Sequence, residues 1–364
     1  MIKSYKFRLY PTKAQVNIFE NWLELCRELY NAALQERRDA WNLNRVSVSY
    51  YDQVKQFTEI REIREDVKAA NSCAIREQLN RVDNTFKAFF RRAKNGEKAG
   101  FPRFKSKTKF DSFTFPDLNG TRLIGNKLKL SKIGKVKIKL HREIEGKIKN
   151  VTIKRECGKW FAIFMAERET KPLPETNKQI GVDVGLRYFA SLSNGETIQN
   201  PRYQETAQKQ LRKAQRKIER RKKGSKRRNK ARFAVKKIHE KIRHQRADFQ
   251  HKQSRILINQ FGLIAVEDLN LNALKKSRLA KQILDAAWGK FFQKLAYKAE
   301  DAGRVFVKVN PNNTSQNCSG CGLKVSKPLS QKIHNCESCG LVLDRDENAA
   351  INILRLGNNL QAIT

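Results

Sequence analysis

Apolar and polar residues alternate along residues 2–10, IKSYKFRLY, which is the period of a β-strand with one buried face. Pro11 ends this pattern, and Thr12 can cap a helix that follows it. From there to about residue 95 the apolar positions recur at the spacing of an amphipathic helix. The sequence therefore predicts one strand followed by a helical region.

Strand signals dominate from residue 113 to residue 170. Alternation predicts strands at residues 127–131 and 135–140, and residues 160–167 have the pattern of a buried strand. Asn-Gly and Cys-Gly pairs between these segments supply turns. We expect a small barrel or wrapped sheet that the N-terminal strand could join, and then a linker at residues 171–176.

A second region with both strands and helices is predicted from about residue 179. QIGVDVG is a buried strand that carries one carboxylate, and two short strands follow it across turns. A meander of three strands followed by helices is how a ribonuclease-H-like domain begins. Further buried strands are predicted at residues 263–269 and 305–311, with a helix at about residues 286–303 between them.

The net charge of the chain indicates the class of partner that it binds. The chain has 76 Lys and Arg residues against 36 Asp and Glu residues, a formal net charge of +40. Such self-repulsion destabilises a compact fold unless a polyanion neutralises it, and nucleic acid is the natural candidate. A chain charged only for solubility is the alternative. No stretch reaches the ~18 apolar residues of a transmembrane helix and the start has no signal-peptide core, so we expect a cytoplasmic, nucleoid-associated protein.

Residues 209–246 concentrate the positive charge, with 19 basic residues against two acidic ones. The pattern allows two helices with a break near Gly224 and Ser225, and a disordered tail is the alternative. Because the tract lies inside a domain, helices that border a nucleic-acid channel fit better. The candidate contacts around the break are Lys222, Lys223, Arg227 and Arg228.

Two earlier segments are also candidates for contact with nucleic acid. The helical stretch 73–94 has a basic side, which could lie against a phosphate backbone or be an ordinary solvated face. Residues 96–112 interleave basic and aromatic residues, which suits phosphate contact with base stacking, although the phenylalanines could instead anchor a loop. The candidate residues are Arg76, Gln78, Arg81, Phe101, Arg103, Phe104 and Lys105.

Four of the seven cysteines form two Cys-x-x-Cys pairs separated by 14 residues. They are Cys318, Cys321, Cys336 and Cys339. In a cytoplasmic chain this spacing favours metal over disulfides, because each pair can present two thiolates to one tetrahedral zinc ion. Four cysteines fill the coordination shell, so a structural zinc site is predicted.

Carboxylates at the ends of apolar segments are the candidate chemistry. Asp183 and Glu267 lie in buried strands, and Asp344 and Asp346 open a predicted helix. A buried carboxylate is costly unless it is paired or bound to metal, and converging carboxylates repel one another unless cations lie between them. Two Mg²⁺ or Mn²⁺ ions held in this way can hydrolyse a phosphodiester. Alternatively, Asp344 or Asp346 could only cap the helix.

Taken together, these motifs resemble the TnpB family, transposon-encoded proteins related to type V CRISPR nucleases. The resemblance rests on GVDVG, IAVEDL, the Cys-x-x-Cys pairs and DRDENAAINIL, and on KFRLYPTKAQ and AGFPRFKSK earlier in the chain. It implies that Asp183, Glu267 and Asp346 are catalytic and hold the metal ions, while Asp344 does not. It also implies a noncoding guide RNA, a short motif beside the target, and cleavage of target DNA.

The resemblance further implies a domain organisation. A ribonuclease-H-like nuclease domain of the RuvC type carries a zinc-ribbon insertion, and a wedge-type β-barrel with an inserted helical recognition domain precedes it. The expected bounds are 1–12 and 99–175 for the barrel, 13–98 for the helical domain, 176–312 and 344–364 for the nuclease, and 313–343 for the zinc module, which would bind target nucleic acid.

Two other functions remain open from sequence. A transposase would act on transposon ends through the same carboxylates and would need no guide RNA. An RNA-guided repressor would bind DNA without cutting it, and would not need Asp183, Glu267 or Asp346.

Overall fold

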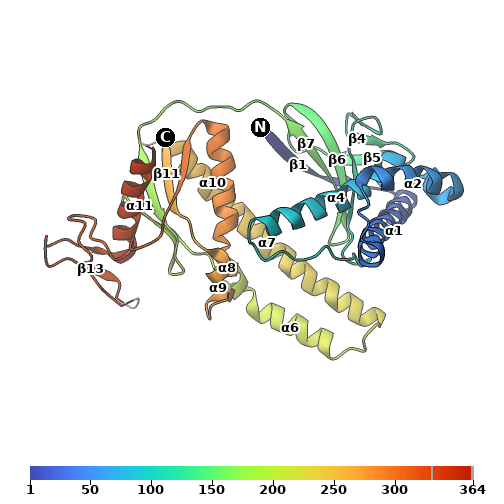
Figure 1. Cartoon of the computed structure of the whole chain (residues 1–364). Helices are drawn as coiled ribbons and strands as arrows, with labels where there is room; N and C mark the ends of the chain where they lie inside the picture. The colour runs from blue at the N-terminus through green and yellow to red at the C-terminus, as the bar shows by residue number, and fades with distance from the viewer. Residues whose placement is uncertain (275, 329–330, 362–364) are drawn as a thin grey trace. The chain divides into compact units, whose positions relative to one another are not determined.

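A computed structural model describes residues 1–274, 276–328 and 331–361 (Figure 1). The chain forms two compact units, Met1–Glu169 and Thr170–Thr364. Among the described residues, no helix combines the length and the apolar character needed to cross a membrane.

The first unit contains a sheet of seven strands in the order β2-β6-β7-β1-β5-β4-β3. Their bounds are β1 Ile2–Tyr10, β2 Ser112–Phe115, β3 Thr121–Ile124, β4 Lys127–Leu130, β5 Gly134–Lys139, β6 Lys147–Glu156 and β7 Lys159–Glu167. The N-terminal strand does join this sheet, between β7 and β5. The order runs from one end strand to the other, so of the two predicted forms, a small barrel or a wrapped sheet, the strand pairing agrees with the open, wrapped sheet.

A side chain from outside the sheet contacts its end strand β2. Arg81 donates hydrogen bonds to the Ser112 carbonyl at 2.9 Å and to Thr114 Oγ1 at 2.8 Å.

Four helices fill the interval between β1 and β2. They are α1 Lys13–Asn44, α2 Tyr50–Ile63, α3 Glu65–Ala69 and α4 Ser72–Lys94. Thr12 caps α1 as predicted, because Thr12 Oγ1 accepts from the Gln15 amide and the Gln15 side chain accepts from the Thr12 amide. Phe19 and Trp22 of α1 pack against Phe113 of β2, which joins the helices and the sheet in one core.

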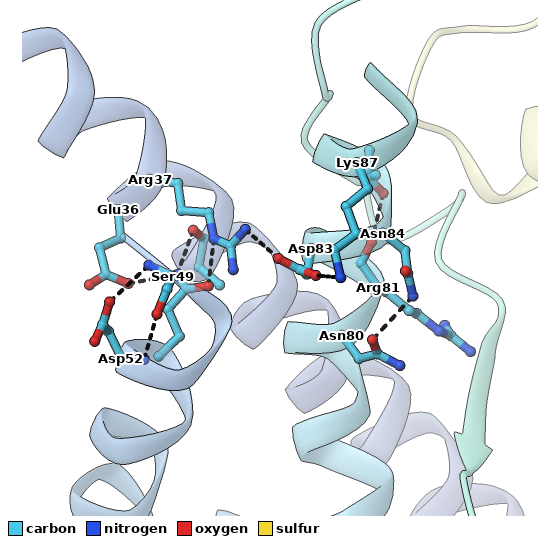
Figure 2. Close-up of polar contacts among 12 residues, drawn as sticks. Glu36, Arg37, Ser49, Asp52, Asn80, Arg81, Asp83, Asn84 and Lys87 are labelled. Atoms are coloured by element: carbon cyan, nitrogen blue, oxygen red, sulfur yellow. Dashed lines mark hydrogen bonds and ion pairs between the residues drawn. The ribbon is translucent and has the colours of Figure 1, made fainter. Parts of the chain in front are cut away.

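An ion-pair network ties α1, α2 and α4 together. Arg37 of α1 donates to Asp83 of α4 at 3.1 Å, and both side chains are largely buried. Figure 2 shows Lys87 on the other side of the same carboxylate, at 2.8 Å. Arg37 also donates to Gln53 of α2 at 2.9 Å. Because these charges are partnered inside a helical packing, they fix how the helices meet.

The second unit contains a sheet of five strands in the order β10-β9-β8-β11-β12. Their bounds are β8 Gln179–Asp183, β9 Tyr188–Leu192, β10 Thr197–Gln199, β11 Leu263–Glu267 and β12 Val305–Val309. β8, β9 and β10 are an antiparallel meander, and β8, β11 and β12 are parallel. This confirms the predicted meander and both later strands.

The remaining elements of this unit are helices and one short hairpin. The helices are α5 Tyr203–Thr206, α6 Gln208–Glu219, α7 Lys226–Gln260, α8 Leu271–Leu274, α9 Ala280–Ala286, α10 Trp288–Ala302 and α11 Arg345–Gln361, and the hairpin pairs β13 Ile333–Asn335 with β14 Val342–Asp344. The basic tract forms α6 and most of α7, which run side by side (Figure 1), so it is a helical hairpin and not a disordered tail. Gly224 has a φ of +83° at the predicted break, and Ser225 caps α7.

Candidate active site and metal centre

Two of the predicted carboxylates lie at the same edge of the five-stranded sheet. Asp183 ends β8 and Glu267 ends β11, and these strands are parallel neighbours with Val182 opposite Val266. Parallel neighbours are about 4.8 Å apart, and residues at equal positions point to the same face. The two side chains therefore project from adjacent strand ends on one face of the sheet.

Helix α11 covers that same face. A Cβ atom on Gly181 would lie 2.0 Å from the Ala350 carbonyl, so only glycine lets the helix come this close to β8. A Cβ on Gly357 would lie 2.6 Å from the Ala265 Cβ, which shows an equally close approach to β11. Since α11 begins at Arg345, its first turn brings Asp346 towards the strand ends.

The two aspartates before and within α11 have different roles. Asp344 Oδ1 accepts the Asp346 amide at 2.8 Å, which satisfies one of the unpaired donors at the helix start. The Asp346 carboxylate is held by Arg345, through Nε at 3.1 Å and Nη2 at 2.9 Å. Asp344 therefore caps the helix, and the Asp346 carboxylate is not used for capping.

The charges of Glu267 and Asp346 act on the carboxyl group of Asp183. The pKa of Asp183 is raised well above its usual range, first by burial and then by the charges of Glu267 and Asp346. Burial also raises the pKa of Glu267, while a hydrogen bond from Thr314 lowers it. A raised folded-state pKa means that stability falls as pH rises through the titration of the carboxyl. A cation would reverse that cost, because it favours the ionised form.

The candidate metal ligands differ in how closely they are grouped. In the described part of the chain, the four cysteines are the one group of candidate ligands whose atoms all lie within 4.8 Å of one another. Asp183, Glu267 and Asp346 do not form such a compact group.

The cysteines converge as their sequence spacing predicts. Cys318 Sγ lies 3.5 Å from Cys339 Sγ, and Cys321 Sγ lies 3.6 Å from Cys336 Sγ. A disulfide would need about 2.05 Å. Four sulfurs at about 2.3 Å from one tetrahedral zinc are about 3.8 Å apart, which is close to these distances. The donor set and its geometry fit zinc.

The thiols of Cys318 and Cys339 differ in their acidity. The pKa of Cys318 is lowered to about 5 although burial opposes this, because the amides of Cys321 and Gly320 and the side chain of His334 stabilise its thiolate. Although the Leu341 amide lowers the pKa of Cys339, hydrogen bonds with the neighbouring thiols and burial raise it to about 12. Zinc binds thiolates, so its binding would displace the remaining thiol protons. His334 is buried, and its Nδ1 contacts Lys327 Nζ.

Two predicted nucleic-acid contacts are corrected by the structure. Gln78 is fully buried and donates to the Ala74 carbonyl, and Arg81 is engaged with β2 as described above. Both side chains lie on the inward side of α4, so the prediction that they contact nucleic acid is wrong for this conformation. Arg76 on the same helix is exposed.

The segment that contains Phe101 and Phe104 is partly packed against the protein and partly exposed. Phe101 packs edge-on against Phe86, and the Arg38 guanidinium lies 5.2 Å from the Phe104 ring centre. Phe101 and Phe104 nevertheless remain 48% and 45% exposed, and Arg103 and Lys105 are exposed. The anchoring alternative is therefore partly true, and contact with nucleic acid stays a prediction.

The basic residues at the turn between α6 and α7 differ in their exposure and contacts. Lys222, Lys223 and Arg227 are exposed. Arg228 instead donates to the carbonyls of Ile218 and Arg221, at 2.8 and 2.7 Å, and so closes the end of α6. Exposed lysine and arginine at this turn remain candidates for phosphate contact, whereas Arg228 is primarily structural.

Sequence reasoning missed a polar layer behind the carboxylates. Thr314 donates to Glu267, and Asn348 and Asn352 of α11 bind the main chain around the first cysteine pair. A signal was present in the sequence: two asparagines four residues apart fall on one side of a helix otherwise rich in apolar residues.

Fold and site define a basic α/β protein with carboxylates at neighbouring strand ends and a four-cysteine group that fits a metal ion. Three family profiles match parts of the chain: "Probable transposase" over residues 162–278, "Cas12f1-like, TNB domain" over 288–353, and "Helix-turn-helix domain" over 1–45. The last description does not fit the structure, in which residues 1–45 form β1 and the single continuous helix α1.

Whole-length relatives give the family. A protein of Streptomyces pristinaespiralis described as a candidate RNA-guided DNA endonuclease is 33% identical, over 98% of this chain and 89% of its own length. A TnpB-like protein of Acanthamoeba polyphaga mimivirus is 26% identical, over 98% of this chain and 73% of its own length. The chain belongs to the TnpB family.

One solved structure shares the fold. The mini-RNA-guided endonuclease CRISPR-Cas_phi3 superposes with a TM-score of 0.59, over 98% of this chain and 92% of that one, at 9% identity. At that identity the similarity concerns the fold alone.

Proposed function

We propose that this protein is a transposon-encoded, RNA-guided DNA endonuclease that acts on DNA in the nucleoid. Its cutting centre would consist of Asp183, Glu267 and Asp346. The observation that carries the proposal is geometric: Asp183 and Glu267 end neighbouring parallel strands, and α11, which carries Asp346 in its first turn, packs on the same face. Whole-length relatives in the TnpB family support the same activity.

The second unit supports assignment to the ribonuclease-H-like fold of the RuvC type. An antiparallel meander continues into two parallel strands, and α11 packs on the face that carries Asp183 and Glu267. We therefore assign residues 176–312 and 344–364 to the nuclease domain and 313–343 to the zinc module. In the first unit, the sheet and the helices correspond to the wedge and recognition domains.

The carboxylates have the chemistry that divalent ions require. Asp183, Glu267 and Asp346 would hold Mg²⁺ or Mn²⁺, which when bound activates water and stabilises the leaving oxygen of a phosphodiester. Burial disfavours the ionised carboxylates, and a bound cation would offset that cost. Arg345 holds Asp346 in one orientation at the start of α11.

The four cysteines would hold zinc in a structural role. All four tetrahedral positions are occupied by sulfur, which leaves none for a water molecule or a substrate.

Positive charge would bind the guide RNA and its duplex with DNA. A net charge of +40 can neutralise many phosphates, and base pairing with the guide can supply the sequence specificity. Exposed candidates for these contacts are Arg76, Phe101, Arg103, Phe104, Lys105, Lys222, Lys223 and Arg227.

Sequencing the RNA that co-purifies with the protein tests this proposal. A DNA target complementary to the variable end of that RNA should be cut in the presence of Mg²⁺, and a scrambled target should stay intact. Exchanging the variable end should move the cut to the newly matching DNA. Strand transfer of transposon ends without RNA would show a transposase instead, and guided binding without any cut would show a repressor.

A further inference from the structure

We propose that Thr314 is a positioning residue for Glu267, held in place by the same helix that carries Asp346. This inference deepens the proposed function and rests on it. It concerns a side chain that lies outside the three carboxylates and outside the four cysteines.

The first step is the contact with the carboxylate. Thr314 Oγ1 donates to Glu267 Oε1 at 2.5 Å, and the two side chains are 3% and 9% exposed. The hydroxyl has one proton, and its other possible acceptor, the Pro311 carbonyl, is farther away at 3.1 Å. The shorter, charge-assisted bond to the carboxylate is the stronger one. With Oε1 held, the plane of the carboxylate is fixed and Oε2 has a defined direction.

The second step is what fixes Thr314. Asn352 Nδ2 donates to the Thr314 carbonyl at 2.9 Å and to the Asn317 carbonyl at 2.7 Å. Asn348, one turn earlier on α11, donates to the Asn317 carbonyl and accepts the Ser319 amide, both at 2.8 Å. Both asparagines are buried, so water competes little for these bonds. Residues 314–319 are thus fastened to α11 along their main chain.

The third step is that these contacts connect the three carboxylates through α11. Helix α11 carries Asp346 in its first turn and binds the segment that holds Glu267, while its close contact at Gly181 sets its position on the strand that carries Asp183. The three carboxylates therefore keep their relative positions through α11 and Thr314. Residues 314–319 include Cys318, so the four-cysteine centre stabilises the end of this segment that lies farther from Glu267.

A merely structural role would give a different result. If Thr314 only satisfied a buried acceptor, its loss would lower stability without changing how the carboxylates bind cations. If it positions Glu267, its loss lowers cation affinity and cleavage in a correctly folded, RNA-loaded protein.

Thr314→Val removes the hydroxyl and keeps the shape, and Thr314→Ser restores the hydroxyl. Removing such an outer partner of a metal ligand typically costs about 10–100-fold, so we expect Thr314→Val to slow single-turnover DNA cleavage by that factor. Mn²⁺ binding, measured by electron paramagnetic resonance on the RNA complex, should weaken in parallel. The Asp183→Asn complex with the same RNA gives the Mn²⁺ bound by RNA, which is subtracted.

Thr314→Ser should restore both cleavage and Mn²⁺ binding, and Ser315→Ala, the neighbouring hydroxyl, should change neither. RNA affinity and zinc content should stay the same in all variants. The proposal is overturned if Thr314→Val cleaves and binds Mn²⁺ as wild type does, or if Thr314→Ser is as defective as Thr314→Val. Should Thr314→Val fail to fold, Thr314→Ala replaces it with the same expected results.

The two proposals fail in different ways. A wild-type protein that never cuts contradicts the endonuclease, while the Mn²⁺ comparison between Thr314→Val and wild type still decides the role of Thr314. Wild-type cleavage with an unaffected Thr314→Val contradicts only the positioning role.

Discussion

Asp183→Asn should abolish guided DNA cleavage while RNA binding remains as in wild type. Asparagine keeps the shape of the side chain but loses the charge that a divalent cation requires. Cation catalysis contributes several kcal/mol to transition-state stabilisation, so we expect a rate loss of about 10³-fold or more. The measurement is single-turnover cleavage of a target matched to the bound RNA.

The same substitution should not destabilise the fold. Because burial and neighbouring charges raise the pKa of Asp183, its ionised form lowers the stability of the metal-free protein at neutral pH, and asparagine removes that cost. In Mg²⁺-free buffer we expect an unchanged or higher unfolding temperature.

Asp268→Asn is the matched control. It makes the same chemical change next to Glu267, but Asp268 is exposed and paired with Lys308 at 3.0 Å, so cleavage should persist. Cleavage by Asp183→Asn at the wild-type rate would show that this carboxylate is not part of the cutting centre.

Cys336→Ser should release zinc and lose both stability and cleavage. One thiolate of four is removed, and metal binding by such a centre is itself folding free energy. Loss of order would spread from the cysteine centre to residues 314–319 and hence to Thr314 and Glu267. Zinc content by atomic spectroscopy, unfolding temperature and cleavage should fall together.

Cys73→Ser controls for the loss of a thiol, since Cys73 lies at the start of α4, far in sequence from the cysteine pairs. It should retain zinc and activity. A Cys336→Ser protein with no zinc but with wild-type cleavage would separate the cysteine centre from the active site and contradict this account.

Much of the nuclease unit could be predicted because its signals are local. A carboxylate inside an apolar strand, as at Asp183, is conspicuous in sequence, since such a group needs a partner. The spacing of the two Cys-x-x-Cys pairs predicts a tetrahedral site with four sulfur ligands. The period of the basic tract gave both helices, and the Gly224 break was visible as a helix breaker.

The errors concern tertiary packing, which periodicity does not determine. Gln78 and Arg81 are predicted to contact nucleic acid, but Gln78 faces the core and Arg81 faces β2. Thr314 was missed because its partner Glu267 is distant in sequence, so no local pattern connects them.

Anomalous diffraction from crystals of the RNA complex grown with Mn²⁺ tests the central claim most directly. The account predicts manganese peaks at about 2.1 Å from carboxylate oxygens of Asp183, Glu267 and Asp346, and a zinc peak among the four cysteines that serves as an internal reference. A map with the zinc peak but with no manganese between those three carboxylates would contradict it.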